Sequence, residues 1–276
     1  MSDHAASRDA RVARGGRHRN ARRTMELHDL GFAAHNILLN GGAATKPGAP
    51  VTADAPLTRA VMRTLDIFFP AERRRGSSIV DLGCLEGGYT VEFARAGFDA
   101  LGIDARQINI DKCNLVAANL ALQNLRFVRD DARNLQVHGT FDVTFCCGLL
   151  YHLDRPAEHL RLLFEQTRRL LILHTHYALP DRNNPRFSLS ELTEHEGYQG
   201  RWYGEFLPDA SQDVVEHAVE SSYGNYRSFW MERTNLIQAL RDVGFSTIYE
   251  QPDFVRNNLS DHYIDEQDRS LFIAVR

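Results

Sequence analysis

The sequence predicts an α/β protein built on a doubly wound, mostly parallel sheet of seven strands. Short apolar runs alternate with stretches of helical periodicity from about residue 57 to the end of the chain. Such alternation places the strands in one parallel sheet with helices on both faces. The run from residue 169 to residue 173 is almost continuously apolar, as expected for a strand that is buried on both sides.

Each element is assigned from its periodicity and from the residues that bound it. Leu57, Val61, Leu65 and Phe68 repeat at helical spacing, and Pro70 ends this first helix. The other predicted helices cover residues 88–96, 106–122, 156–167 and 233–243, and the predicted strands cover residues 78–82, 99–103, 125–129, 141–147, 169–175, 247–251 and 271–275.

Three segments flank or interrupt this pattern. Residues 1–24 contain seven arginines and two aspartates without apolar periodicity, and we expect a disordered basic arm. Residues 25–56 are rich in loop-forming residues and are predicted to be an N-terminal lid, with a small hairpin turn at Asn40-Gly41-Gly42. The main domain, residues 57–276, carries a polar and aromatic insertion at 180–227, which should cap the carboxyl edge of the sheet.

Composition limits the functional classes. The chain has 276 residues, of which 43% are hydrophobic and 25% charged, as in ordinary soluble proteins. No run of 18 apolar residues and no secretory signal is present, so a cytoplasmic protein is expected. The four cysteines lack paired metal spacing and should be reduced thiols. A net charge of −4 argues against broad nucleic-acid binding, although the basic arm leaves RNA contact open, and a homodimer also stays open.

The segment 78–90 and the strand that follows it carry the strongest functional signal. An apolar run ends in Asp81 and a glycine-rich turn, a helix follows, and a second apolar run ends in Asp104, 21 residues after Gly83. Glycines in such a turn let the backbone approach a ligand, and the second acid can accept hydrogen bonds from both ribose hydroxyls. The unit therefore predicts a nucleoside site at the carboxyl edge of the sheet.

The details of the turn choose the cofactor. A dinucleotide site needs G-x-G-x-x-G, whereas this turn reads G-C-L-E-G-G from Gly83 to Gly88. Glu86 and Asp81 also place negative charge where a pyrophosphate would lie. A cationic ligand fits better, and S-adenosyl-L-methionine (SAM) has sulfonium and ammonium groups. A glycine turn without a ligand is the plain alternative.

The D-x-G-C-x-x-G pattern beginning at Asp81 resembles motif I of the class I SAM-dependent methyltransferases, whose fold is Rossmann-like. Leu85 departs from that motif, because most members have glycine there. The G-L-L-Y-H run at 148–152 and the H-x-I-x-L run at 35–39 are similar to a group that contains sugar and natural-product O-methyltransferases and tRNA wobble-uridine (carboxy)methyltransferases.

The resemblance implies the cofactor contacts. The backbone of the turn should line the amino-acid half of SAM, with the carboxylate of Asp81 near its ammonium group. Asp104 and the adjoining Ala105 should hold the ribose. At the end of the third strand, Asp131 with Ala132 should hold adenine, and Asp131 fits better than Asp130 because Ala132 follows it. The full set of implied cofactor residues is Asp81, Gly83, Leu85, Glu86, Gly87, Asp104, Ala105, Asp131, Ala132 and Cys147.

His152 is the candidate catalytic residue. It lies in the loop after the fourth strand, close to the expected position of the methyl acceptor. Transfer of a methyl group to a hydroxyl requires removal of a proton, which an imidazole accepts near neutral pH. In the alternative interpretation, His152 only packs against the cofactor.

Other polar and aromatic side chains are candidates for the acceptor site. His174 and His176 end the fifth strand on one face and are expected to bind substrate. A divalent metal, magnesium, bound by them with Asp181, Glu194 or Glu196 stays unproven, because magnesium prefers more oxygen ligands. The remaining candidate substrate contacts are His35, Trp202 and Tyr203.

These observations predict a SAM-dependent O-methyltransferase that acts on a hydroxyl of a sugar, an oligosaccharide or another small metabolite. In the tRNA enzymes basic residues follow the G-V-L-Y-H run, whereas here Leu153 and Asp154 follow it, which favours a small-molecule substrate. A tRNA wobble-uridine enzyme and a non-catalytic SAM-binding module are the two alternatives.

Overall fold

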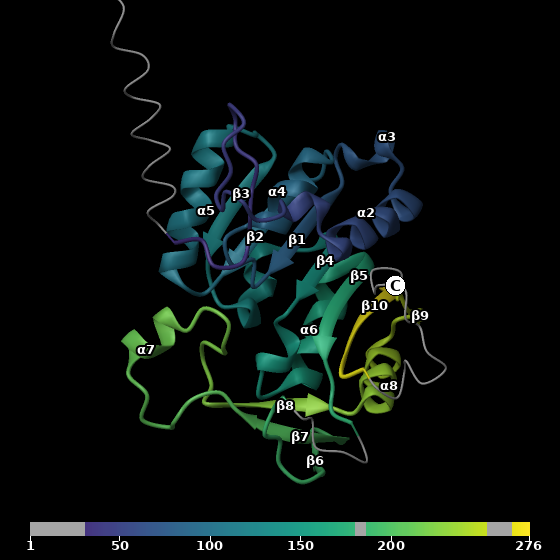
Figure 1. The fold of residues 1–276 in the computed structure, drawn as a ribbon. Helices are drawn as coiled ribbons and strands as arrows, with labels where there is room; N and C mark the ends of the chain where they lie inside the picture. Colours follow the sequence, from purple (N-terminus) through teal and green to yellow (C-terminus); the bar gives the residue numbers. More distant parts are fainter. Residues whose placement is uncertain (1–30, 180–185, 253–266) are drawn as a thin grey trace, which may run out of the picture.

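The fold confirms the predicted α/β class (Figure 1). The computed structural model describes residues 31–179, 186–252 and 267–276, so the basic arm lies outside the described residues. Its main sheet has the strand order β3-β2-β1-β4-β5-β10-β9, in which β1 to β5 are parallel and β10 runs antiparallel to both of its neighbours. The strands are β1 (Ser78–Leu82), β2 (Asp99–Asp104), β3 (Leu125–Arg129), β4 (Phe141–Cys147), β5 (Thr167–His176), β9 (Thr247–Glu250) and β10 (Arg269–Val275).

Helices cover both faces of this sheet. One face packs against α2 (Pro56–Phe68), α4 (Gly88–Arg95) and α5 (Gln107–Leu120), and the other against α6 (Pro156–Gln166) and α8 (Arg233–Val243). The shorter helical turns are η1 (Thr52–Asp54), α3 (Ala71–Arg74), η2 (Ala132–His138) and η3 (Leu150–His152). No helix in the described ranges has the length and apolar character of a membrane span.

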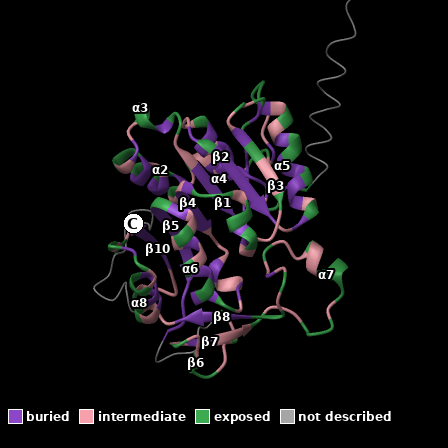
Figure 2. Ribbon diagram, turned by 180° about the vertical axis from the view of Figure 1, so that it is seen from behind, coloured by how far each residue is buried: buried purple, intermediate pink, exposed green. Residues whose placement is uncertain are grey.

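Two apolar cores result from the alternation of side chains along each strand. In β1, Ile79 belongs to the core beneath α2 and α4, whereas Val80 belongs to the core beneath α6 and α8. In β5, Ile172 and Leu173 divide in the same way. All four side chains are fully buried, which explains why these strands read as apolar runs (Figure 2).

The described part of the predicted N-terminal lid, residues 31–56, packs on the α4 side of the sheet. Phe32, Ile37 and Leu39 are buried in the same core as α2 and α4. The expected hairpin is reduced to one antiparallel bridge between Leu38 and Ala44, around a turn that includes Gly41 and Gly42 in the left-handed region. The lid is therefore held by its apolar side chains rather than by a strand ladder.

The insertion is more regular than its polar sequence indicates. Three antiparallel strands, β6 (Thr193–His195), β7 (Tyr198–Gly204) and β8 (Arg227–Met231), form a second sheet, and α7 (Gln212–His217) lies between β7 and β8. This sheet is tied to η3, because the Phe229 N–H donates to the Leu153 carbonyl. Figure 1 shows it beyond the carboxyl end of β5. Gly200 and Gly204 interrupt the alternation of apolar and polar residues along β7, so the sequence did not indicate this strand.

Candidate functional site

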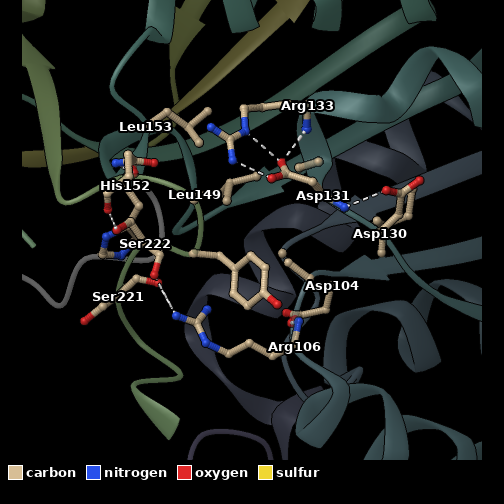
Figure 3. Close-up of a pocket in the computed structure, with 17 residues that line it drawn as sticks. Asp104, Arg106, Asp130, Asp131, Arg133, Leu149, His152, Leu153, Ser221 and Ser222 are labelled. Carbon is tan, nitrogen blue, oxygen red and sulfur yellow. Dashed lines mark hydrogen bonds and ion pairs between the residues drawn. The ribbon is translucent and has the colours of Figure 1, made fainter. Parts of the chain in front are cut away.

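A pocket lies at the carboxyl edge of the parallel strands (Figure 3). The strand order reverses between β1 and β4, which is where open α/β sheets bind their ligands. Residues at the ends of β1 to β4 line one side of the pocket, and residues 221–225 of the insertion line the other. The predicted site residues on its wall are Gly83, Asp104, Ala105, Asp131, Ala132 and His152.

Asp104 ends β2 with its carboxylate buried in the pocket wall. One oxygen accepts from the Leu85 N–H at 3.0 Å, and the other accepts from the Arg106 N–H at 2.9 Å and the Asn109 amide at 3.0 Å. Burial raises the pKa of Asp104, although these donors oppose the shift. A carboxylate can accept about four hydrogen bonds, so Asp104 keeps capacity for a further hydroxyl donor.

Asp131, which caps η2, has a strong protein partner. Its carboxylate accepts from the Arg133 N–H at 2.9 Å and pairs with both Nε and Nη2 of the Arg133 guanidinium, at 3.0 and 2.5 Å. Burial opposes ionisation, but the hydrogen bonds from Arg133 lower the pKa of Asp131 overall. Asp130 is tied instead to Asn134 and His138. Of the two acids, Asp131 is the one fixed by a bidentate arginine at the pocket.

Arg106 holds the insertion over this pocket. Its guanidinium donates to the carbonyls of Val215, Ser221 and Ser222 at 2.7 to 3.0 Å, and it lies 5.4 Å from the ring centroid of Tyr223. In Figure 3 the Arg106 side chain reaches from the β2 side of the pocket to Ser221. The insertion therefore closes the pocket through a buried arginine of the main domain, which no sequence motif had indicated.

Glu86 ties the lid to the glycine-rich turn. Its carboxylate accepts from the N–H groups of Ala33, Ala34 and His35 at 2.6 to 3.1 Å, and pairs with Lys112 at 3.0 Å. Burial opposes ionisation, but these donors lower the pKa of Glu86. Its charge is thus balanced within the protein, which differs from the expectation that it faces a cationic ligand.

His35 lies against the same turn. Its Nδ1 accepts from the Gly88 N–H at 3.1 Å, its ring meets Tyr89 edge-on, and burial lowers its pKa to about 4. His35 therefore supports the start of α4 as a neutral imidazole, and its contact with substrate stays a prediction.

Asp81 and Cys147 lie behind the pocket, among the buried strand ends. The Thr90 hydroxyl donates to Asp81 at 2.6 Å, and burial raises the pKa of this carboxyl to about 7. Burial raises the pKa of the Cys147 thiol to about 12. Without a ligand, the Cys147 thiol is thus neutral at pH 7, whereas Asp81 is neutral only well below pH 7 and is about half ionised at pH 7.

His152 lies at the boundary between the pocket and the insertion. Its Nδ1 is 2.8 Å from a carboxylate oxygen of Glu205, whose side chain is almost fully buried. The same carboxylate accepts from the Ser222 N–H at 3.1 Å and the Ser228 hydroxyl at 2.8 Å. An ionised carboxylate can only accept, so in the neutral imidazole Nδ1 carries the proton and Nε2 keeps its lone pair.

Glu205 was not expected from the sequence. It follows Gly204 in a polar and aromatic run, and it lies 53 residues from His152, with no spacing pattern that relates the two. Only the docking of the second sheet onto η3 brings this carboxylate to the imidazole. The resulting pair has the form of an oriented general base.

Comparison of the sequence and the fold with known proteins indicates the kind of domain that carries this site. Residues 79–172 match a family model described as a methyltransferase domain, and this range contains β2 to β4, η3, all but the first residue of β1 and all the candidate cofactor residues. This part of the chain is a SAM-dependent methyltransferase domain. A search of curated proteins finds no significant match to this chain.

Solved structures support the fold of the methyltransferase over nearly its whole length. The N-terminal domain of EvdMO1, solved with S-adenosyl-homocysteine (SAH) and D-fucose, is 24% identical with a TM-score of 0.67, and the match covers 95% of this chain and 97% of that domain. CcbJ methyltransferase from Streptomyces caelestis is 15% identical with a TM-score of 0.54, over 82% of this chain and 92% of that one. The chain spans about half of full-length EvdMO1, at 49%.

An aromatic cluster of the methyltransferase adjoins His152. His176 stacks on Trp230 with ring centroids 4.9 Å apart, and Tyr151 meets both rings edge-on. Phe187 and Tyr203 complete this cluster from the insertion. Such a set of rings suits a ring-shaped ligand. The ring centroids of Tyr151 and of the pocket residue His152 are 4.2 Å apart.

Trp202 and Tyr203 point to opposite sides of β7. Tyr203 joins the cluster around Trp230, whereas Trp202 packs between His195, Phe229 and the Arg227 guanidinium. Successive residues of a strand alternate between its faces, so only one of this pair can face the acceptor side. The structure therefore separates two residues that the sequence placed together.

The candidate metal ligands do not converge. Within the described parts of the chain, no group of three or more His, Cys, Asp or Glu side chains is placed to hold a metal ion. Glu196 instead accepts from the Ala157 and Glu158 N–H groups at the start of α6. Glu194 is exposed on β6, and Asp181 lies outside the described residues.

Gly87, in the cofactor turn, gives a direct test of the local structure. It has φ +79°, and a Cβ there would lie 2.6 Å from the Phe127 ring. Gly87→Ala should therefore lower the free energy of unfolding by about 2–5 kcal/mol, the sum of left-handed strain and overpacking. Gly76 has φ +85° with open space around it. In urea unfolding, Gly76→Ala should lose about 1–2 kcal/mol, and equal losses for both variants would contradict the packing argument.

Proposed function

We propose that this methyltransferase transfers a methyl group from SAM to a hydroxyl of a sugar or a similar small metabolite, with His152 as the general base. The observation that carries the proposal is the His152–Glu205 pair at the edge of the cofactor pocket. An imidazole with one nitrogen fixed by a buried carboxylate is suited to take a proton from a hydroxyl.

The cofactor half of the site is assigned to the residues on the pocket wall. Asp104 has acceptor capacity for one ribose hydroxyl, and Ala105 lies beside it on the wall. Asp131 and Ala132 are assigned to adenine, with Arg133 fixing the carboxylate. Asp81 and Cys147 are assigned to the region of the amino-acid half, and Gly83, Leu85, Glu86 and Gly87 contribute their backbone. The donors and acceptors present therefore fit a nucleoside with a cationic amino-acid group.

Each protein group then has one part in the reaction. Bound SAM supplies an electrophilic methyl group on its sulfonium. Nε2 of His152 accepts the proton of the acceptor hydroxyl as the oxygen–methyl bond forms and the sulfur–methyl bond breaks. The Glu205 carboxylate balances the positive charge that develops on the imidazole. Arg106 holds the insertion, and with it Glu205, over the pocket, which keeps water away from the transfer.

The acceptor is assigned to the aromatic cluster beside His152. His176, Tyr203 and Trp230 offer ring faces, and His174 lies two residues before His176 on β5. The N-terminal domain of EvdMO1 was solved in the presence of D-fucose, which supports a sugar as the acceptor class of this chain. We include the lid and the insertion in the site as the segments that enclose the acceptor.

Methyl transfer from labelled SAM to a panel of sugars and to bulk tRNA tests this proposal. The full chain and a variant lacking residues 1–24 should methylate the same sugar acceptors at equal rates, because the proposal gives the basic arm no part. Label incorporated only into tRNA, and lost with the arm, would establish the wobble-uridine alternative. SAH binding without label in any acceptor would favour a non-catalytic binding module.

A further inference from the structure

Arg269 brings a positive charge to the acceptor side of the site. It begins β10 opposite His176, at the carboxyl edge of the parallel strands. Its guanidinium reaches across β5, because Nη2 lies 3.5 Å from the position of a Cβ on Gly148 at the end of β4. It also lies 5.4 Å from the ring centroid of Tyr151. The side chain therefore points toward Gly148 and Tyr151, in the loop after β4, rather than toward solvent beyond β9.

The Arg269 guanidinium has no counter-charge in the described part of the chain. Its Nε is buried without a hydrogen-bond partner, and no ion pair joins it to a described carboxylate. The nearby Asp268 carboxylate lies 3.5 Å from His176 instead. The side chain is half-buried, and a buried N–H donor without an acceptor is unfavourable, because the hydrogen bond it made to water is not replaced.

The side chains packed around Arg269 are neutral. Burial raises the pKa of the Tyr151 phenol and of the Cys147 thiol, the latter to about 12, and burial also lowers the pKa of His174, with Arg269 adding to the effect. The methyl donor would add the positive charge of its sulfonium at the same edge of the sheet. Two cations at one partly buried site repel each other unless an anion lies near them.

We propose that Arg269 is an anion subsite of the acceptor pocket and that the acceptor carries a carboxylate, as in a sugar acid. This inference rests on the proposed function and narrows its substrate class. A guanidinium binds a carboxylate through two parallel hydrogen bonds, and a single negative charge matches its single positive charge. Tyr151 contacts both the His152 ring and the Arg269 guanidinium, so one sugar acid can place its hydroxyl at the first and its carboxylate at the second.

Equilibrium binding to the SAH-loaded full chain tests the subsite without turnover. The probes are D-glucuronate and D-galacturonate, each compared with its neutral counterpart, D-glucose or D-galactose. At least one acid should bind tenfold or more tightly than its neutral counterpart. Arg269→Gln should abolish this preference, and Arg269→Lys should keep part of it. The exposed Arg126 provides a control, since Arg126→Gln should leave the preference intact. Thermal unfolding of each variant verifies that it is folded.

Four results would overturn the inference. The first is that neither acid is preferred over its neutral counterpart. The second is that Arg269→Gln keeps the preference. The third is that Arg269→Gln weakens SAH binding as strongly as acid binding, because the carboxylate held would then be that of the cofactor. Methylation of neutral sugars alone would also remove the subsite while leaving O-methyl transfer intact. Selective binding of an acid that is never methylated would support the subsite and contradict the proposed function.

Discussion

Replacing His152 by glutamine is expected to reduce kcat about 100- to 10,000-fold while leaving the affinity for SAH within about twofold of the wild type. Glutamine can still donate a hydrogen bond to Glu205, but it cannot take up the acceptor proton. Because Asp104 and Asp131 are held by hydrogen bonds that do not involve His152, cofactor binding should persist. Stopped-time methyl transfer at saturating acceptor, with SAH titration by calorimetry, measures the two effects separately.

Two further variants establish that the effect belongs to the pair. Glu205→Gln should also lower kcat, since it removes the charge that stabilises the imidazolium and leaves the donors of Ser222 and Ser228 poorly matched. His217 lies exposed in α7, and His217→Gln should leave kcat unchanged. Full activity of His152→Gln would mean that the hydroxyl loses its proton to another group or to water.

Asp81→Asn is expected to become more stable relative to the wild type as the pH rises. The pKa of Asp81 is raised to about 7 in the fold by burial, against an ordinary value near 4, so the folded state holds a proton that the unfolded state releases. The stabilisation from this proton is complete below pH 4 and is lost as the pH rises to 7. Three pKa units correspond to roughly 4 kcal/mol of unfolding free energy.

Urea unfolding of the ligand-free protein between pH 4 and pH 8 measures this difference. Asp209→Asn, at an exposed position, should show the pH dependence of the wild type. A cationic amino group beside Asp81 favours the ionised carboxyl. SAH should therefore bind more tightly to the wild type as the pH rises through 7, and this increase should be absent in Asp81→Asn. Parallel stability curves for Asp81→Asn and wild type would contradict the assignment of a protonated Asp81.

Much of the fold could be predicted because it depends on local patterns. The strands at 78–82, 125–129 and 141–147 and the helix at 233–243 have the predicted bounds, since apolar runs and Gly244 delimit them clearly. The fifth strand is longer than predicted and starts at Thr167, where β-branching favours a strand immediately after α6. The second sheet was not predicted, because β6 to β8 bury one face against η3 and so keep polar residues on the other.

The candidate site divides in the same way. Asp104, Asp131 and His152 lie on one pocket because each follows a parallel strand, and parallel strands end at the same edge. Glu86 and His35 looked like ligand contacts, but their hydrogen bonds join the lid to the turn. Both residues lie in or near motifs typical of a cofactor site, whereas the hydrogen-bond partners of their side chains are other groups of the protein.

The sequence by itself determined the sheet, the place of the pocket and the class of cofactor, because a strand that ends in an acid and a glycine turn imposes these through its own backbone. The tertiary structure alone decided which charges have partners. Glu205 meets His152 only because the insertion folds back onto η3, and Arg269 meets Tyr151 only because β10 inserts antiparallel beside β5. Hydrogen bonds and ion pairs between distant segments depend on how those segments pack, and a linear pattern of residues carries no record of that packing.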